Sequence, residues 1–114
     1  MTRPSVTCDR WAVVVVPFPF TDKAGTKKRP ALVLSGPDFN GSGHTVLAMI
    51  TSKGHSPWPG DTPLNDFVAA GLRVPCLVRL KLFTLDNRLL LDQVGSLTGT
   101  DAERVGKVLR EVLP

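Results

Sequence analysis

Glycine and proline divide this chain into segments that are too short for most helices. The 114 residues include ten glycines and ten prolines, which recur along almost the whole length. Both residue types interrupt regular structure, so the segments between them favour short strands over long helices. We therefore expect several strands joined by tight connections.

Apolar runs between these breaks predict the strands. The clearest run, Trp11 to Val16, is rich in β-branched residues and continuously apolar, so both of its faces are expected to be covered. The segment that follows, Pro17 to Phe20, has prolines that cannot donate ladder hydrogen bonds, so it is expected at a sheet edge or outside the sheet. Further strands are expected at residues 31–35, 44–51, 62–64, 76–85 and 89–95.

Only the C-terminal segment has a good helical pattern. A helix is expected over Thr98 to Leu113, with Thr100 as N-cap and Glu103 completing a capping box. A helical turn is expected over 65–70, ended by Gly71. The predicted fold class is mostly β, a small barrel with a packed C-terminal helix. We assign one domain over residues 1–114, in which residues 1–9 form a loose arm.

Composition allows a soluble domain with a polyanionic partner. The chain is 42% hydrophobic and carries a formal net charge of +4, which suits RNA, DNA or an acidic protein as partner. No signal peptide and no stretch of membrane-spanning length is evident. Cys8 and Cys76 form no CxxC pair, so we expect free thiols, a cytoplasmic location and no metal site.

Motifs of the common enzyme classes are missing. The chain has no GxSxG, HExxH, P-loop or GxGxxG motif, and its carboxylates are scattered. A two-histidine ribonuclease site gains no support from the spacing of His44 and His55. The residues alone indicate a basic, mostly β domain with an arginine at one strand start and a threonine at another strand end.

Four segments resemble, in the right order, the PemK/MazF family of toxins. These segments are Val13 to Asp22, Lys27 to Ser35, Ala48 to Ser52, and Val78 to Asp86. The resemblance continues through Val94–Leu97 and the closing helix. It implies an SH3-like barrel, a homodimer, and cleavage of single-stranded RNA without a metal or other cofactor. It also implies an acidic cognate antitoxin, in complex with which the toxin binds DNA.

The resemblance assigns Arg29 and Thr51 as the catalytic residues. In metal-free cleavage the ribose 2′-oxygen attacks the adjacent phosphate, and a planar guanidinium can hold two of the phosphate oxygens on which charge develops. We assign this role to Arg29 and leave open a role as proton donor. A threonine hydroxyl is too weak an acid or base to act alone, so we assign Thr51 to orientation.

Further residues are expected to bind RNA. Lys27, Lys28 and Lys53 would contact phosphates, and Arg79 is a weaker candidate. Trp58 would stack on a base or take part in the dimer contact.

Two features depart from the family pattern. Many relatives begin the first strand with Gly-Asp where this chain has Trp11-Ala12. Some also place a carboxylate in the segment of Arg79, where the nearby positions here are Leu80 and Lys81, so no carboxylate base is expected in that segment. Two other functions stay open. One is a non-catalytic barrel that inhibits a protein target, like the related gyrase poisons, and the other is an inactive homologue that binds an antitoxin.

Overall fold

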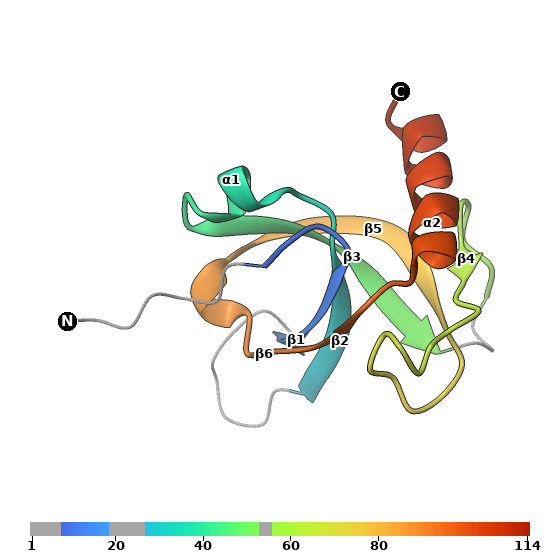
Figure 1. Ribbon diagram of the computed structural model, residues 1–114, viewed down its shortest axis with the longest axis horizontal. Helices are drawn as coiled ribbons and strands as arrows, with labels where there is room; N and C mark the ends of the chain where they lie inside the picture. The colour runs from blue at the N-terminus through green and yellow to red at the C-terminus, as the bar shows by residue number, and fades with distance from the viewer. Residues whose placement is uncertain (1–7, 19–26, 53–55) are drawn as a thin grey trace.

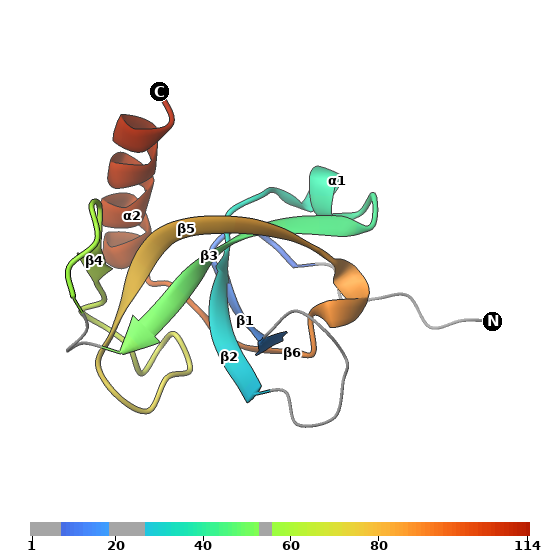
Figure 2. The same cartoon turned by 180° about the vertical axis from the view of Figure 1, so that it is seen from behind.

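The computed structural model describes residues 8–18, 27–52 and 56–114. Six strands form one antiparallel sheet in the order β4-β5-β3-β2-β1-β6, followed by the C-terminal helix α2. The elements are β1 (Ala12–Phe18), β2 (Lys27–Val33), α1 (Pro37–Asn40), β3 (His44–Ser52), β4 (Thr62–Pro63), β5 (Cys76–Asp86), the 3₁₀ helix η1 (Asn87–Leu89), β6 (Asp92–Ser96) and α2 (Gly99–Val112). The sheet curls into a half-barrel with α2 at one end, so the mostly β fold class is confirmed (Figures 1 and 2).

Alternation along the strands divides the core between the two faces of the sheet. One cluster, which includes Val13, Leu32 and Val78, packs around Val105 of α2. The other, which includes Val14 and Leu47, fills the concave face. Both faces of β1 are therefore buried, as its continuous apolar run predicts. Within the described residues, no helix is long and apolar enough to cross a membrane.

The N-cap of α2 is Thr98, so the assignment of Thr100 is wrong. The Thr98 hydroxyl accepts a hydrogen bond from the backbone N–H of Asp101. Asp101 is fully buried, and its carboxylate accepts hydrogen bonds from the backbone N–H groups of Asn65 and Asp66. The N-cap therefore lies two residues before the predicted one, and the first turn of α2 also anchors the loop before β5.

Gly71 ends the turn at residues 65–70, as the sequence indicates. Its φ is +80°, and an added Cβ would lie 2.2 Å from the carbonyl oxygen of Val94. Only glycine meets both requirements. The last strand is shorter than expected, since η1 occupies Asn87–Leu89 and β6 starts only at Asp92. The side chain of Asn87 is buried and bonds to Thr45 and Asn40, which fixes this helical turn against β3.

Trp11 lies directly before β1. It is the one non-glycine residue in the described part of the chain with a positive φ, +76°, a conformation that costs about 1–3 kcal/mol. An added Cβ at Gly106 of α2 would lie 3.6 Å from the ring, and the Arg10 guanidinium lies 4.3 Å from the ring centroid. The aromatic contacts offset the backbone strain and help to seat α2 on the sheet.

Candidate active site

A break in the ladder between β2 and β3 opens the site. These strands pair at Ala31–Met49, Leu32–Ala48 and Val33–Leu47, and the pairing stops there. The next residue of β2, Pro30, has no N–H to donate, and the two strands diverge beyond it (Figure 2). Arg29 and Thr51 therefore lie on the two strands just beyond the end of the ladder.

Strand alternation brings the predicted residues to the same face of the sheet. Met49 pairs with Arg79 on β5 and Thr51 with Leu77, so Arg79 is a diagonal neighbour of Thr51. Such diagonal neighbours lie about 7–8 Å apart, within reach of a long side chain. On β2, Arg29 shares its face with Ala31, the residue opposite Met49. Arg29, Thr51 and Arg79 are thus gathered although 50 residues of chain separate the first from the last.

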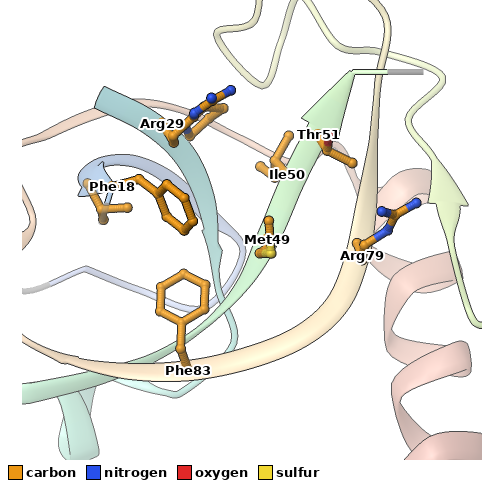
Figure 3. A pocket seen from close by; sticks show the side chains of 9 residues that line it. Phe18, Arg29, Met49, Ile50, Thr51, Arg79 and Phe83 are labelled. Carbon is orange, nitrogen blue, oxygen red and sulfur yellow. The ribbon is translucent and has the colours of Figure 1, made fainter. Parts of the chain in front are cut away.

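These three side chains line a pocket of about 270 Å³. Figure 3 shows Arg29 and Thr51 above an apolar floor on which the rings of Phe18 and Phe83 approach each other, and Arg79 on β5 with its guanidinium turned toward β4. The complete lining is Val16, Phe18, Arg29, Pro30, Met49, Ile50, Thr51, Arg79 and Phe83. The pocket therefore combines cationic and hydroxyl groups at its rim with apolar surface beneath.

Arg29 stands at the open side of this pocket. Its side chain is exposed, and no described residue forms an ion pair or hydrogen bond with its guanidinium. Thr51 is half-buried, and its hydroxyl likewise bonds to no described residue. Both groups are available to a ligand that enters the pocket.

Arg79, in contrast, is held by a carboxylate. Its Nε donates to Asp61 Oδ1 at 3.1 Å, and its Nη2 donates to Asp61 Oδ2 at 2.9 Å and to the Ser56 carbonyl at 2.8 Å. The carboxylate comes from the loop before β4 and not from the positions next to Arg79 in the chain, which are Leu80 and Lys81. These hydrogen bonds from Arg79 hold the pKa of the Asp61 carboxyl below its usual value, and Asp61 raises the pKa of the guanidinium.

The other predicted RNA-binding residues lie around the pocket or outside the described residues. Lys27 and Lys28 begin β2 and are exposed close to Arg29. Trp58 does not line the pocket, and the Lys81 ammonium lies 4.3 Å from its ring centroid. Lys53 lies outside the described residues.

Sequence reasoning missed Asp61 and the apolar floor. The floor residues Met49 and Phe83 follow from alternation, since each is two residues from a core residue of the same face, Leu47 and Leu85 respectively. Asp61 is 18 residues from Arg79, and no motif joins them.

The arrangement suits an anionic ligand with an apolar part. An unpaired guanidinium can bind two phosphate oxygens, and a base or ribose can cover the apolar floor. No cluster of three or more His, Cys, Asp or Glu side chains occurs within 8–18, 27–52 and 56–114. His44 lies at the far end of β3 from Thr51, and His55 is outside the described residues. The two-histidine alternative thus gains nothing from the fold.

Solved structures similar to this chain include several toxins. MazF from Deinococcus radiodurans is 27% identical, with a TM-score of 0.71 over 95% of this chain and 97% of that chain. A MazE–MazF complex from the same organism is 24% identical, with a TM-score of 0.71 over 94% and 97%. An endoribonuclease from mycobacterial species has a TM-score of 0.73 at 15% identity, over 97% and 95%. No curated protein matches the chain in sequence.

The family comparison covers nearly the whole sequence. The model of the PemK-like, MazF-like toxins of type II toxin–antitoxin systems matches residues 9–113. The match includes every strand and the C-terminal helix. The chain therefore belongs to the PemK-like, MazF-like toxin family.

Proposed function

We propose that the protein is an endoribonuclease that cuts single-stranded RNA without a metal ion. The observation that carries the proposal is that the Arg29 guanidinium, which bonds to no described residue, and the Thr51 hydroxyl line the same open pocket. Family membership and similarity to an endoribonuclease support the same reaction class.

In the proposed reaction the 2′-oxygen attacks the adjacent phosphorus and the bond to the 5′-oxygen breaks. The products are a 2′,3′-cyclic phosphate and a 5′-hydroxyl, so the proton lost by the 2′-OH is matched by one gained at the 5′-oxygen. Arg29 binds the non-bridging oxygens, where negative charge increases in the transition state. Thr51 donates a hydrogen bond that orients the reacting phosphate.

Binding along the RNA chain uses charges outside the pocket. Lys27 and Lys28 stand exposed on the same strand as Arg29 and would contact neighbouring phosphates, and Lys53 is proposed for the same role. Each phosphate contact would make binding weaker at higher salt concentration.

In the cell, we expect growth inhibition that a cognate antitoxin reverses. A similar structure from Deinococcus radiodurans contains MazF together with MazE, which supports a partner of this kind. We also propose that the protein is a homodimer. Sedimentation at micromolar concentration should give twice the chain mass of 12.3 kDa.

RNA cleavage in a chelating buffer tests the activity. The wild type should cut single-stranded RNA in EDTA, give 2′,3′-cyclic ends, and leave DNA of the same sequence whole. Arg29→Ala should be slower by about 10²–10³-fold, the usual cost of removing one donor to a developing oxyanion.

Arg88→Ala is the matched control for this loss of charge. Arg88 is an exposed arginine beyond the end of β5 that is remote from Arg79. The control should cut at the wild-type rate. Intact RNA with the wild type, or equal rates for Arg29→Ala and Arg88→Ala, would contradict the proposal.

A further inference from the structure

Strand register places Asp61 opposite Arg79. The short strand β4 pairs with β5 at Thr62–Val78 and Pro63–Leu77. One residue further along this register, Asp61 faces Arg79. A turn before β4, in which the Asp61 N–H donates to the Trp58 carbonyl at 3.0 Å, fixes the approach of the backbone. The ion pair is thus built into the edge of the sheet.

The pair is shielded from solvent, and hydrogen bonds hold both of its side chains. The side chains of Arg79 and Asp61 are only 12% and 15% exposed. Nε and Nη2 of Arg79 are both occupied by Asp61, and Nη2 also donates to Ser56. Nη1 bonds to no described residue. Because the positions of Nε and Nη2 in the planar group are fixed, the directions of the two remaining Nη1 N–H donors are fixed as well.

Asp61 itself is unsuited to act as the general base. Its Oδ1 accepts from Arg79, and its Oδ2 accepts from Arg79 and from the backbone N–H of Trp58 at 3.0 Å. The same bonds lower its pKa, which makes it a weaker base than an ordinary carboxylate. It also does not line the pocket, whereas Arg79 does. The carboxylate therefore acts on Arg79 and not on the RNA.

We infer that Asp61 is a positioning residue that holds Arg79 beside Thr51 as a fixed binding group for an RNA phosphate. The inference rests on the proposed function, since it names a second phosphate contact at the same pocket. Arg79 is in place before RNA arrives, so little side-chain entropy is lost on binding. A lone arginine at this position would sample several rotamers and bind the phosphate less often in the productive geometry.

The test measures binding and cleavage separately. Binding is followed with a 2′-O-methyl RNA oligonucleotide, which lacks the attacking hydroxyl, and cleavage is followed under single-turnover conditions. Asp61→Asn keeps the side-chain shape but removes the charge. It should weaken binding of the oligonucleotide about 10-fold and lower kcat/KM by about 10–100-fold, mainly through KM, because the guanidinium is no longer fixed.

Three further variants make the result specific. Arg79→Ala should cause a similar loss, and the double variant should be no worse than Arg79→Ala alone, because both changes remove one unit. Asp61→Glu, which keeps the charge, should restore part of the binding. Asp86→Asn breaks a pair of the same bidentate geometry, Arg88–Asp86, far from the pocket and should leave binding unchanged.

Several outcomes overturn the inference. Asp61→Asn that binds as tightly as the wild type shows that Arg79 needs no support. Tighter binding shows that Asp61 withholds Arg79 from the RNA. If the losses of Asp61→Asn and Arg79→Ala add up in the double variant, and kcat falls while KM is unchanged, Asp61 acts as a general base. If the wild type cuts no RNA, the proposed function fails, and the binding measurements still decide the role of Asp61.

Discussion

Each side of the pocket is formed where two neighbouring strands end, and each carries one arginine. The two arginines differ in whether a carboxylate binds them. At the β2–β3 side the ladder stops at Pro30, the strands diverge, and Arg29 is left exposed, with no partner among the described residues. At the β4–β5 side the register continues to Asp61, whose carboxylate binds Arg79 in a shielded ion pair. We call the side with Arg29 the free side, because no described residue holds its guanidinium, and the side with Arg79 the fixed side, because Asp61 holds it.

The difference indicates a division of labour. A free guanidinium can follow the phosphate as its geometry changes during the reaction, whereas a fixed one offers the same geometry to substrate and transition state. Interactions that strengthen only in the transition state raise kcat, and uniform ones lower KM. We therefore expect Arg29 to control kcat and Arg79 to control KM.

Exchange of each arginine for lysine tests this division most directly. Lysine keeps the charge but lacks the planar fork that binds two oxygens. Arg29→Lys should lower kcat about 100-fold with little change in KM, since a donor to the developing charge is lost. Single-turnover kinetics at saturating RNA measures kcat. Arg79→Lys should mainly raise KM, and a fall in kcat of equal size at both positions would show that the two sides do not differ.

Removal of the Thr51 hydroxyl should have the next largest effect. Thr51→Val is close in shape, so it removes the hydrogen bond and leaves the strand intact. We expect kcat to fall about 10-fold, as for a neutral donor that orients the phosphate. Thr51→Ser keeps the hydroxyl and should retain most of the rate. Equal rates for Thr51→Ser and Thr51→Val would mean that the hydroxyl of Thr51 does not contribute to the reaction.

The free side of the pocket was predictable from the sequence, and the fixed side only in part. Arg29 and Thr51 lie in segments that resemble the family, and alternation in two long strands brings them together. Asp61 depends on β4, which has only two residues and follows a proline- and glycine-rich loop. So short a strand carries no periodic signal, and its register cannot be read before the fold is known.

Local signals also failed where a tertiary contact opposed them. Thr100 and Glu103 satisfy a capping-box pattern, yet α2 begins after Thr98 because Asp101 must reach the loop at Asn65 and Asp66. Trp11 has a positive φ that no side-chain preference predicts. Its contact with Gly106 comes from a helix almost a hundred residues later. In both places packing decided the backbone conformation.

Acid should act on the shielded ion pair more strongly than on the exposed one. The folded-state pKa of Asp61 is lowered by its hydrogen bonds with Arg79, and that of Asp86 is lowered by Arg88. A lowered carboxyl pKa contributes stability at pH values above the unfolded-state pKa, about 3.9 for aspartate, and this stability is lost as pH falls through the folded-state pKa. The exposed pair is screened by water and salt, so its share should be smaller.

Thermal melting between pH 6 and 2 measures this contribution. The melting temperature of the wild type should fall more steeply on acidification below about pH 4 than that of Asp61→Asn, which lacks the titrating group. Asp86→Asn should follow the wild-type curve closely. Curves for Asp61→Asn and wild type that stay parallel to pH 2 would mean that the shielded pair adds nothing to the stability of this side of the pocket.

Substitution of Trp58 should have the smallest effect on RNA binding. It tests whether the Arg79 side of the pocket also binds a base through the Trp58 ring. Its backbone N–H binds Asp61, but its ring lies outside the pocket with Lys81 against it. Removal of a ring on which a base stacks costs about 1–3 kcal/mol, or roughly 5–150-fold in affinity. Because Lys81 covers one face of the ring, we expect Trp58→Ala to raise the Kd of the 2′-O-methyl oligonucleotide by at most about 5-fold.

Fluorescence anisotropy with a labelled oligonucleotide measures this change, and Trp58→Phe, which keeps an aromatic ring, is its control. A loss of 50-fold or more with Trp58→Ala, but not with Trp58→Phe, would make the ring a stacking platform. The fixed side would then recognise a base in addition to a phosphate. Arg29 would remain the group assigned to the reaction, because it lines the pocket with Thr51 and the Trp58 ring does not.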